Sequence, residues 1–160
     1  MNLLITGVHG FVGSNLVNYL SLNNTIYGLD IIQPERNGIV KTFPWEALDQ
    51  PNAIPQIDAI IHLAGKAHDT RNKSAADVYF KVNTGLTKKI FDWYEASPTA
   101  MKFIFFSTAK AAAECVPDIL KENVIPTPKG PYGESKIQAE DYIIEALEKQ
   151  GVSRASMSSF

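Results

Sequence analysis

Tyr132 and Lys136 form the pair whose residue types and spacing best suggest catalysis. They stand four positions apart and follow Pro131, a residue that favours the first turn of a helix. Because residues four apart share a helix face, the lysine ammonium should lie beside the tyrosine hydroxyl. A neighbouring positive charge favours the phenolate and lowers the pKa of a tyrosine from about 10 toward neutrality. The pair could therefore act as a general acid and base.

Two further hydroxyl groups, those of Ser107 and Thr108, end an apolar run that begins at Met101. This run is typical of a strand, so both hydroxyls should stand at its carboxyl end. One interpretation is that they cap a helix or close a turn. The other is that one of them donates a hydrogen bond to a substrate oxygen. Taken alone, the pattern favours capping.

Three glycines, Gly7, Gly10 and Gly13, follow the apolar residues 3–5 and precede a helix-like pattern. A strand, a glycine turn and a helix in this order form a phosphate-binding unit. Gly7 permits a positive φ in the turn, Gly10 lets a pyrophosphate approach the backbone, and Gly13 lets the helix lie close to the strand. The N–H groups that start the helix would face the anion. The alternative is a glycine-rich turn without a ligand.

Asp30 ends the second predicted strand, residues 25–30. A carboxylate at this place can accept hydrogen bonds from both ribose hydroxyls of an adenine nucleotide. It would also repel a 2′-phosphate, which favours NAD over NADP. The alternative is a solvated aspartate of a loop.

A near-continuous apolar run, residues 57–65, predicts a central parallel strand buried on both faces. Ala64 and Gly65 end it, where an open α/β sheet binds its ligands. These small residues indicate either room for a cofactor or a tight turn. His62, within the same run, is interpreted as a packed structural histidine rather than a base or metal ligand.

A long helix is predicted over residues 74–96, with Ser74 and Asp77 forming a capping box. Asn83 lies beside its apolar stripe and must find polar partners. It is therefore either a tie between helix and loop or a neighbour of the cofactor. The stripe itself consists of Val78, Val82, Leu86, Ile90 and Trp93.

Composition narrows the class of protein. The 160 residues suit one domain with its own core, and 45% of them are hydrophobic. The net charge of −2, with no basic run, argues against a nucleic-acid partner. The single cysteine, Cys115, excludes an intrachain disulfide and fits a cytoplasmic protein. We also expect no metal site, no signal peptide and no membrane span.

Together these motifs resemble the extended short-chain dehydrogenase/reductase family, which includes NAD-dependent nucleotide-sugar epimerases and dehydratases. The resemblance covers residues 1–149 and implies an α/β fold, a Rossmann-type doubly wound parallel sheet with strand order 3-2-1-4-5. The matching pieces, in order, are Thr6-Gly7-x-x-Gly10-x-x-Gly13, Asp30, His62-Leu63-Ala64-Gly65, Asn83, Ser107-Thr108 and Tyr132-Gly133-Glu134-Ser135-Lys136.

The resemblance also implies roles for individual residues. Thr108, Tyr132 and Lys136 would be catalytic: Tyr132 as the base, Lys136 on the nicotinamide ribose, and Thr108 as a donor to the sugar oxygen. Asp30 would hold the adenosine ribose, and Asn83 would position the layer beside the cofactor. The NAD-binding set would be Gly7, Gly10, Phe11, Val12, Gly13, Asp30, Leu63, Ala64, Gly65, Asn83, Tyr132 and Lys136.

The implied chemistry is 4-epimerisation of a nucleotide sugar, with a UDP-sugar as the expected substrate and a homodimer as a possible assembly. Tyr132 would remove the proton of the sugar 4-hydroxyl while a hydride passes to NAD and later returns to the opposite face. Related dehydratases carry an acid pair directly after the Ser/Thr, where Ala109 and Lys110 stand here. Asp30 disfavours NADP-dependent reductases. The alternatives are a dehydratase or reductase of the same family and a non-catalytic NAD-binding module.

Length separates this chain from the family, whose members run to roughly twice 160 residues. We expect residues 1–150 to form the NAD-binding domain and the serine-rich residues 151–160 to be a disordered tail, so that the chain is truncated before the substrate lobe. Turnover by this chain alone should then be weak or nil. The strand containing residues 103–106 should form an apolar sheet edge that invites self-association.

Overall fold

The computed structural model describes residues 1–66, 75–97, 102–113, 119 and 125–151. The chain forms two compact units, the first comprising residues 1–65 and 89–106 and the second residues 66–88 and 107–160. The first unit contains a sheet, and the second is helical. The domain boundary at residue 150 stays a prediction, and residues 152–160 of the predicted tail lie outside the described part.

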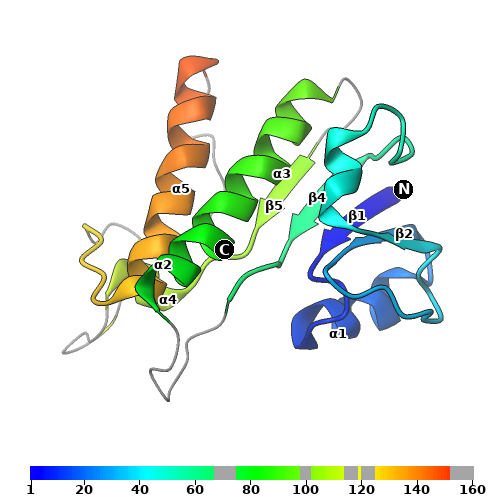
Figure 1. The fold of residues 1–160 in the computed structure, drawn as a ribbon, viewed down its shortest axis with the longest axis horizontal. Helices are drawn as coiled ribbons and strands as arrows, with labels where there is room; N and C mark the ends of the chain where they lie inside the picture. The colour runs from blue at the N-terminus through cyan, green and yellow to red at the C-terminus, as the bar shows by residue number, and fades with distance from the viewer. Residues whose placement is uncertain (67–74, 98–101, 114–118, 120–124, 152–160) are drawn as a thin grey trace. The chain divides into compact units, whose positions relative to one another are not determined.

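Five parallel strands form the sheet of the first unit in the order β3-β2-β1-β4-β5 (Figure 1). This arrangement confirms the predicted Rossmann-type strand order. At the centre of the sheet, Leu4 of β1 pairs with Tyr27 of β2 and Ile60 of β4. The strands are β1 (Asn2–Thr6), β2 (Thr25–Leu29), β3 (Lys41–Phe43), β4 (Ala59–His62) and β5 (Lys102–Phe105).

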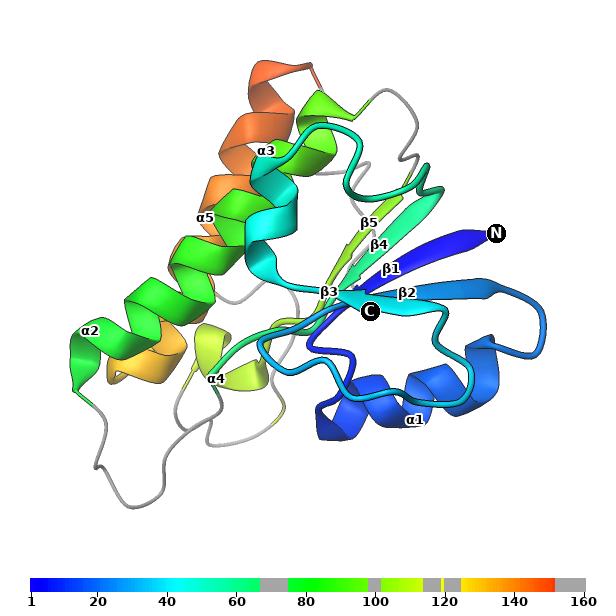
Figure 2. The same ribbon diagram turned by 45° about the vertical axis from the view of Figure 1, so that its right-hand side comes forward.

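Helices cover both faces of this sheet, as a doubly wound fold requires. One face packs on helix α1 (Phe11–Leu20), whose Val17 belongs to the same buried cluster as Ile5 and Ile61 (Figure 2). On the other face, the ring of Phe103 meets that of Phe91, from α3 (Gly85–Ala96), edge-on at 5.0 Å. The alternation of residues along β1 and β4 supplies both faces with apolar side chains.

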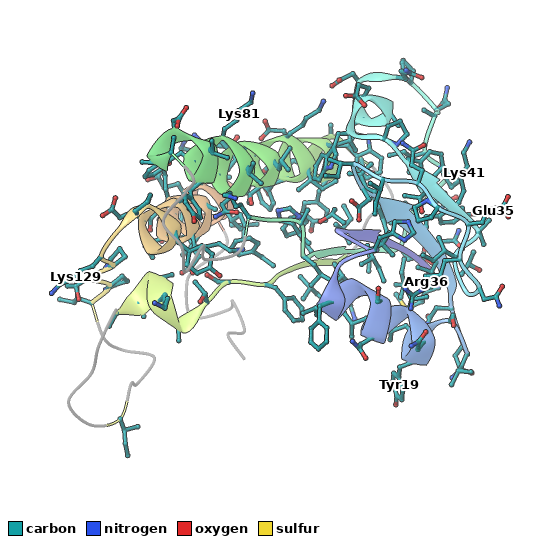
Figure 3. All side chains as sticks on the ribbon, turned by 60° about the horizontal axis from the view of Figure 1, so that its bottom comes forward. Tyr19, Glu35, Arg36, Lys41, Lys81 and Lys129 are labelled. Carbon is teal, nitrogen blue, oxygen red and sulfur yellow. The ribbon has the colours of Figure 1, made fainter. Side chains whose placement is uncertain are left out.

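The spacing of Val12, Leu16 and Leu20 predicts one buried face for helix α1, and Leu16 and Leu20 do pack against the core, whereas Val12 does not. Val12 is exposed, whereas Gly13 and Val17 are buried and Leu16 is half-buried. The reason is that Gly13 touches the backbone of the preceding turn, which fixes the rotation of the helix and brings Val17, four residues later, onto the sheet. Tyr19 consequently points away from the sheet (Figure 3).

The connection after β2 lies along α1. The guanidinium of Arg36 donates to the hydroxyl of Ser14 at 2.8 Å and to the side-chain oxygen of Asn18 at 3.3 Å (Figure 3). The chain then forms β3 and, after Pro44, the 3₁₀ helix η1 (Trp45–Asp49).

The second unit is built from α2 (Ala76–Tyr79), the π-helical segment η2 (Phe80–Thr84), the first turn of α3, α4 (Ala109–Ala112) and α5 (Pro131–Lys149). Helix α5 begins at Pro131 as predicted. Ala75 caps α2 without a side-chain hydrogen bond, and the predicted start at Ser74 lies outside the described residues. No helix in the described ranges is long and apolar enough to cross a membrane.

The predicted apolar stripe of the long helix is wrong in its first half. Val78 is 37% exposed, while Tyr79, Asn83 and Thr84 are buried. The π-helical segment explains the difference, because a π turn adds one residue and shifts the face that a 3.6-residue period predicts. Polar residues thus occupy the buried side of this helix.

Candidate active site

The glycine turn after β1 requires a glycine at its first position. Gly7 has a φ of +66°, and its N–H donates to the carbonyl of Leu29 at 2.9 Å. A Cβ on Gly7 would lie 2.9 Å from the backbone of Ala64. Gly7 therefore combines a left-handed backbone with close contact to the residues that follow β4, as predicted for the tight turn.

The other two glycines of the motif have different surroundings. A Cβ on Gly13 would lie 2.5 Å from the carbonyl oxygen of Gly7 and 2.8 Å from Val8 Cα. A Cβ on Gly10 would meet only the Gly7 oxygen, at 3.2 Å. Gly13 is thus required by packing, whereas the space beside Gly10 is open to an approaching group.

The start of α1 offers backbone N–H groups to an anion. Gly10 is its N-cap without a side-chain hydrogen bond, and the first turn holds no acidic residue. Phe11 is 86% exposed, so the end of the helix is accessible. The first N–H groups of a helix have no intrahelical partner and carry a partial positive charge. This end is therefore suited to a phosphate.

Asp30 is buried beside this turn and orders it. Its Oδ2 accepts the N–H of His9 at 3.0 Å, and its Oδ1 accepts the N–H of Ile31 at 2.7 Å. A carboxylate has about four acceptor sites, so these two bonds leave capacity for ribose hydroxyls. The side chain of His9 in turn reaches Thr42 Oγ1 of β3 at 2.9 Å.

Thr6, for which the sequence analysis predicted no separate role, joins the carboxyl ends of β1 and β4. Its Oγ1 accepts the N–H groups of Leu63 and Ala64 at 3.1 and 3.0 Å and lies 2.6 Å from His62 Nδ1. Because this oxygen accepts two N–H groups, its hydroxyl proton can be donated to Nδ1 in the His62 tautomer that carries the ring proton on Nε2. His62 is buried and stacks on Phe105 at 5.6 Å, as a structural histidine should.

In the second unit, Tyr132 and Lys136 lie on the first two turns of α5. Lys136 is only 6% exposed. Its burial lowers the pKa of the ammonium from 10.5 to about 8, against the opposing charge of Glu140. The ring of Tyr132 lies edge-on to that of Tyr79 at 6.2 Å.

Asn83 ties a helix to a loop. Its Oδ1 accepts the N–H of Lys66 at 2.7 Å, and its Nδ2 donates to Ser135 Oγ at 3.0 Å and to the carbonyl of Lys66 at 3.3 Å. Ser135 Oγ then donates to the carbonyl of Tyr132 at 2.9 Å. Of the two interpretations of Asn83, the structure therefore shows the link between helix and loop, and contact with a cofactor stays a prediction.

Thr108 is the N-cap of α4, and its Oγ1 accepts the N–H of Lys110 at 3.3 Å. This capping role leaves the hydroxyl proton available for donation. Ser107 donates its hydroxyl to the carboxyl of Glu140 on α5. Close packing of α4 and α5 depends on Gly133, where a Cβ would lie 2.4 Å from the carbonyl oxygen of Lys110.

Sequence reasoning missed Glu140, and it assigned no separate role to Gly133 and Ser135, although both lie in the matching motif around Tyr132 and Lys136. A spacing signal for Glu140 was present, because Tyr132, Lys136 and Glu140 recur every four residues and so share a helix face. Ser135 and Gly133 carry no comparable signal, since their partners come from distant segments. Within the described ranges, no group of three or more His, Cys, Asp or Glu residues could hold a metal ion.

Comparison with known proteins identifies the family. The profile of the NAD dependent epimerase/dehydratase family matches residues 3–160. The chain belongs to this family.

Three similar proteins have names that describe epimerases and a reductase. The sequence is 30% identical over 158 residues to the N-acetyl-alpha-D-glucosaminyl-diphospho-ditrans,octacis-undecaprenol 4-epimerase of Escherichia coli O157:H7, covering 96% of this chain and 46% of the relative. It is 26% identical over 152 residues to the GDP-6-deoxy-D-mannose reductase of Pseudomonas aeruginosa, covering 89% and 46%. The UDP-glucuronic acid 4-epimerase of Bacillus cereus, solved with UDP-glucuronic acid and NAD, superposes with a TM-score of 0.75 at 24% identity, covering 93% and 52%. The chain therefore spans about half the length of these proteins.

NAD is the cofactor of this family by its description. The first unit fits such a group: Gly10 leaves its surroundings open, the start of α1 carries no capping side chain, and Asp30 retains acceptor capacity. The residues present are thus compatible with a dinucleotide.

Proposed function

We propose that this chain carries the NAD-binding and acid–base residues of a nucleotide-sugar 4-epimerase that acts on a UDP-sugar. The observation that carries the proposal is the burial of Lys136 beside the start of α5. A buried ammonium costs free energy, and the fold has no evident need for one at this position. Strongly perturbed lysines of this kind are typical of catalytic sites.

Cofactor binding is assigned to the predicted residues. The backbone at Gly7, Gly10 and Gly13, with Phe11 and Val12 at the helix start, would hold the pyrophosphate. Asp30 would hold the adenosine ribose. Leu63, Ala64, Gly65 and Asn83 would border the cofactor, and Lys136 would bind the nicotinamide ribose.

The proton chemistry is assigned to Tyr132, Lys136 and Thr108. Tyr132 would take the proton from the sugar 4-hydroxyl and return it, and the ammonium of Lys136 would favour the phenolate that this step requires. Thr108 would donate its hydroxyl proton to the sugar oxygen. NAD, when bound, supplies a hydride acceptor and donor.

An epimerase is preferred to the other reactions of the family on two observations. The relative at 30% identity is a 4-epimerase. Ala109 and Lys110 follow Thr108, so the position lacks the acid pair of the dehydratases. The reductase among the relatives supports a second candidate, an NADP-dependent reductase. Asp30 separates the two, because its carboxylate would repel a 2′-phosphate. A homodimer and a cytoplasmic location stay predictions.

Calorimetric titration of the purified chain with NAD, and with NADP in parallel, tests the proposal. Binding selective for NAD is expected, and Gly10→Ala should weaken it at least about tenfold because the new methyl group occupies the space of the pyrophosphate. Gly85→Ala is the matched control: its Cβ meets nothing nearer than 3.8 Å, and it should bind NAD as the wild type does.

The reaction is tested separately by following the conversion of UDP-glucose to UDP-galactose by NMR. Any epimerisation by the chain should disappear in Tyr132→Phe while NAD binding is retained. Selective binding of NADP would instead favour the reductase. Failure of both dinucleotides to bind would contradict the cofactor assignment.

A further inference from the structure

Glu140 connects the two segments of the second unit that carry the proposed chemistry. It lies one turn beyond Lys136 on the face of α5 that also holds Tyr132. Its carboxyl group, half-buried, accepts the hydroxyl of Ser107 from 33 residues earlier in the chain.

We infer that Glu140 is a positioning residue that provides the counter-charge of Lys136 and holds the Ser107–Thr108 segment on α5. The inference rests on the proposed function, because it concerns the same acid–base residues. Glu140 itself is not expected to touch the substrate or the cofactor.

The surroundings of Lys136 show why Glu140 acts as its counter-charge. Burial disfavours its ammonium, and the negative charge of Glu140 acts in the opposite direction and raises the pKa of Lys136. Burial in turn raises the pKa of Glu140, while the hydrogen bond from Ser107 lowers it. The buried ammonium of Lys136 and the half-buried carboxylate of Glu140, one helical turn apart, therefore stabilise each other.

Other ionisable groups do not replace Glu140 in this role. Helices α2, η2 and α4 pack against α5. Of their charged residues, Asp77 and Lys81 are exposed, and no charge but that of Glu140 opposes the burial of Lys136 among the described residues. Asp141, next to Glu140, raises the pKa of Glu140. The remaining ionisable groups on these three elements are Tyr79 and Lys110, and Lys88 of α3 lies over the ring of Tyr142 on α5.

The position of Ser107 explains how Glu140 holds the Ser107–Thr108 segment on α5. This residue directly precedes Thr108, whose side chain caps α4. At the other side of this cap, the carbonyl of Lys110 packs on Gly133 of α5. The segment from Ser107 to Lys110 is thus fixed to α5 at both ends, by a hydrogen bond to Glu140 and by backbone packing on Gly133.

The experiment separates the charge from the tie by comparing Glu140→Gln with Glu140→Ala and Ser107→Ala in the full chain. The amide of Glu140→Gln can still accept the hydroxyl of Ser107 but carries no charge. The titration of the Lys136 side chain is followed by NMR on ¹⁵N-lysine, with its signal assigned by its loss in Lys136→Arg. Hydrogen exchange of the amides of Lys110 and Ala111 reports on the tie. Glu145→Gln, an exposed glutamate on the same helix, is the control.

In Glu140→Gln, the midpoint of the Lys136 titration should fall by about one pH unit from its value near 8, with little change in exchange at α4. Glu140→Ala and Ser107→Ala should speed this exchange severalfold, and Glu145→Gln should change neither quantity. An unchanged Lys136 titration in Glu140→Gln would overturn the inference, whether or not the chain binds NAD. If the midpoint falls and no variant binds NAD, the counter-charge stands and the proposed function fails.

Discussion

Replacement of Gly13 by alanine tests whether the glycine motif is required by packing before any ligand binds. The new Cβ would lie 2.5 Å from the Gly7 carbonyl oxygen and 2.8 Å from the Cα and carbonyl oxygen of Val8. All three are backbone atoms of the turn, so no rotamer change can relieve the contacts. The turn or the helix must move instead.

Two opposing effects set the magnitude. Overpacking of this kind costs about 1–3 kcal/mol, and the backbone contacts place Gly13 in the upper part of that range. Alanine is better than glycine inside a helix by about 1 kcal/mol. The net loss in the free energy of unfolding should therefore be about 1–2 kcal/mol, or a fall of roughly 2–8 °C in Tm for a domain of this size.

Thermal and urea unfolding, followed by circular dichroism, measure the effect. Gly10→Ala is the matched control in the same motif, since its Cβ would meet only one atom at 3.2 Å, and it should lower Tm much less. Gly85→Ala, exposed in a helix, should leave Tm unchanged or raise it slightly. A Gly13→Ala protein as stable as the wild type would refute the argument that this glycine is fixed by packing.

Three further changes give measurable outcomes. Thr6→Val keeps the shape of the side chain but removes the hydroxyl group that is bonded to His62 and to the N–H groups of Leu63 and Ala64, so urea unfolding should show a loss of about 3 kcal/mol in the free energy of unfolding. Lys136→Met should raise the free energy of unfolding at pH 7 by about 1–3 kcal/mol, because burial in the folded protein disfavours the ammonium. This gain should shrink as the pH rises from about 8 to 10.5, since the folded wild type loses the lysine proton first and the unfolded chain loses it at the higher pH. A gain that does not depend on pH would contradict the assignment. Ile104→Lys, on a 43% exposed residue of the edge strand β5, should reduce self-association in light scattering and leave the unfolding midpoint within about 0.5 kcal/mol of the wild type.

The sheet was predictable because its signals are local. The apolar run at residues 57–65 and the glycines after β1 each occupy a few consecutive residues, and the right-handed rule for parallel strands limits how they connect. Strand order, the positive φ of Gly7 and the start of α5 at Pro131 are accordingly confirmed. Strand ends were predicted too long, since β4 covers only Ala59–His62.

The contacts that build the site were not predictable, because each joins segments far apart in the chain. Thr6 meets residues 56–58 positions later, and Asn83 meets Ser135 across 52 positions. No local pattern encodes such pairs. The helical stripe failed for a different reason: apolar periodicity presumes a regular helix, and the π turn before α3 breaks the period within the pattern itself.

The buried polar residues divide into two kinds, and the division distinguishes folding from chemistry. Thr6, Asp30, Asn83 and Ser135 each bond backbone groups of a turn or loop, and no buried side-chain nitrogen or oxygen in the described ranges lacks a partner. Such bonds stabilise the fold that they order. Lys136 differs, because a buried ammonium is less favourable than an apolar side chain of similar size. A residue that the fold carries at a cost to its stability is best explained by a reaction, and the pH-dependent stability of Lys136→Met measures that cost directly.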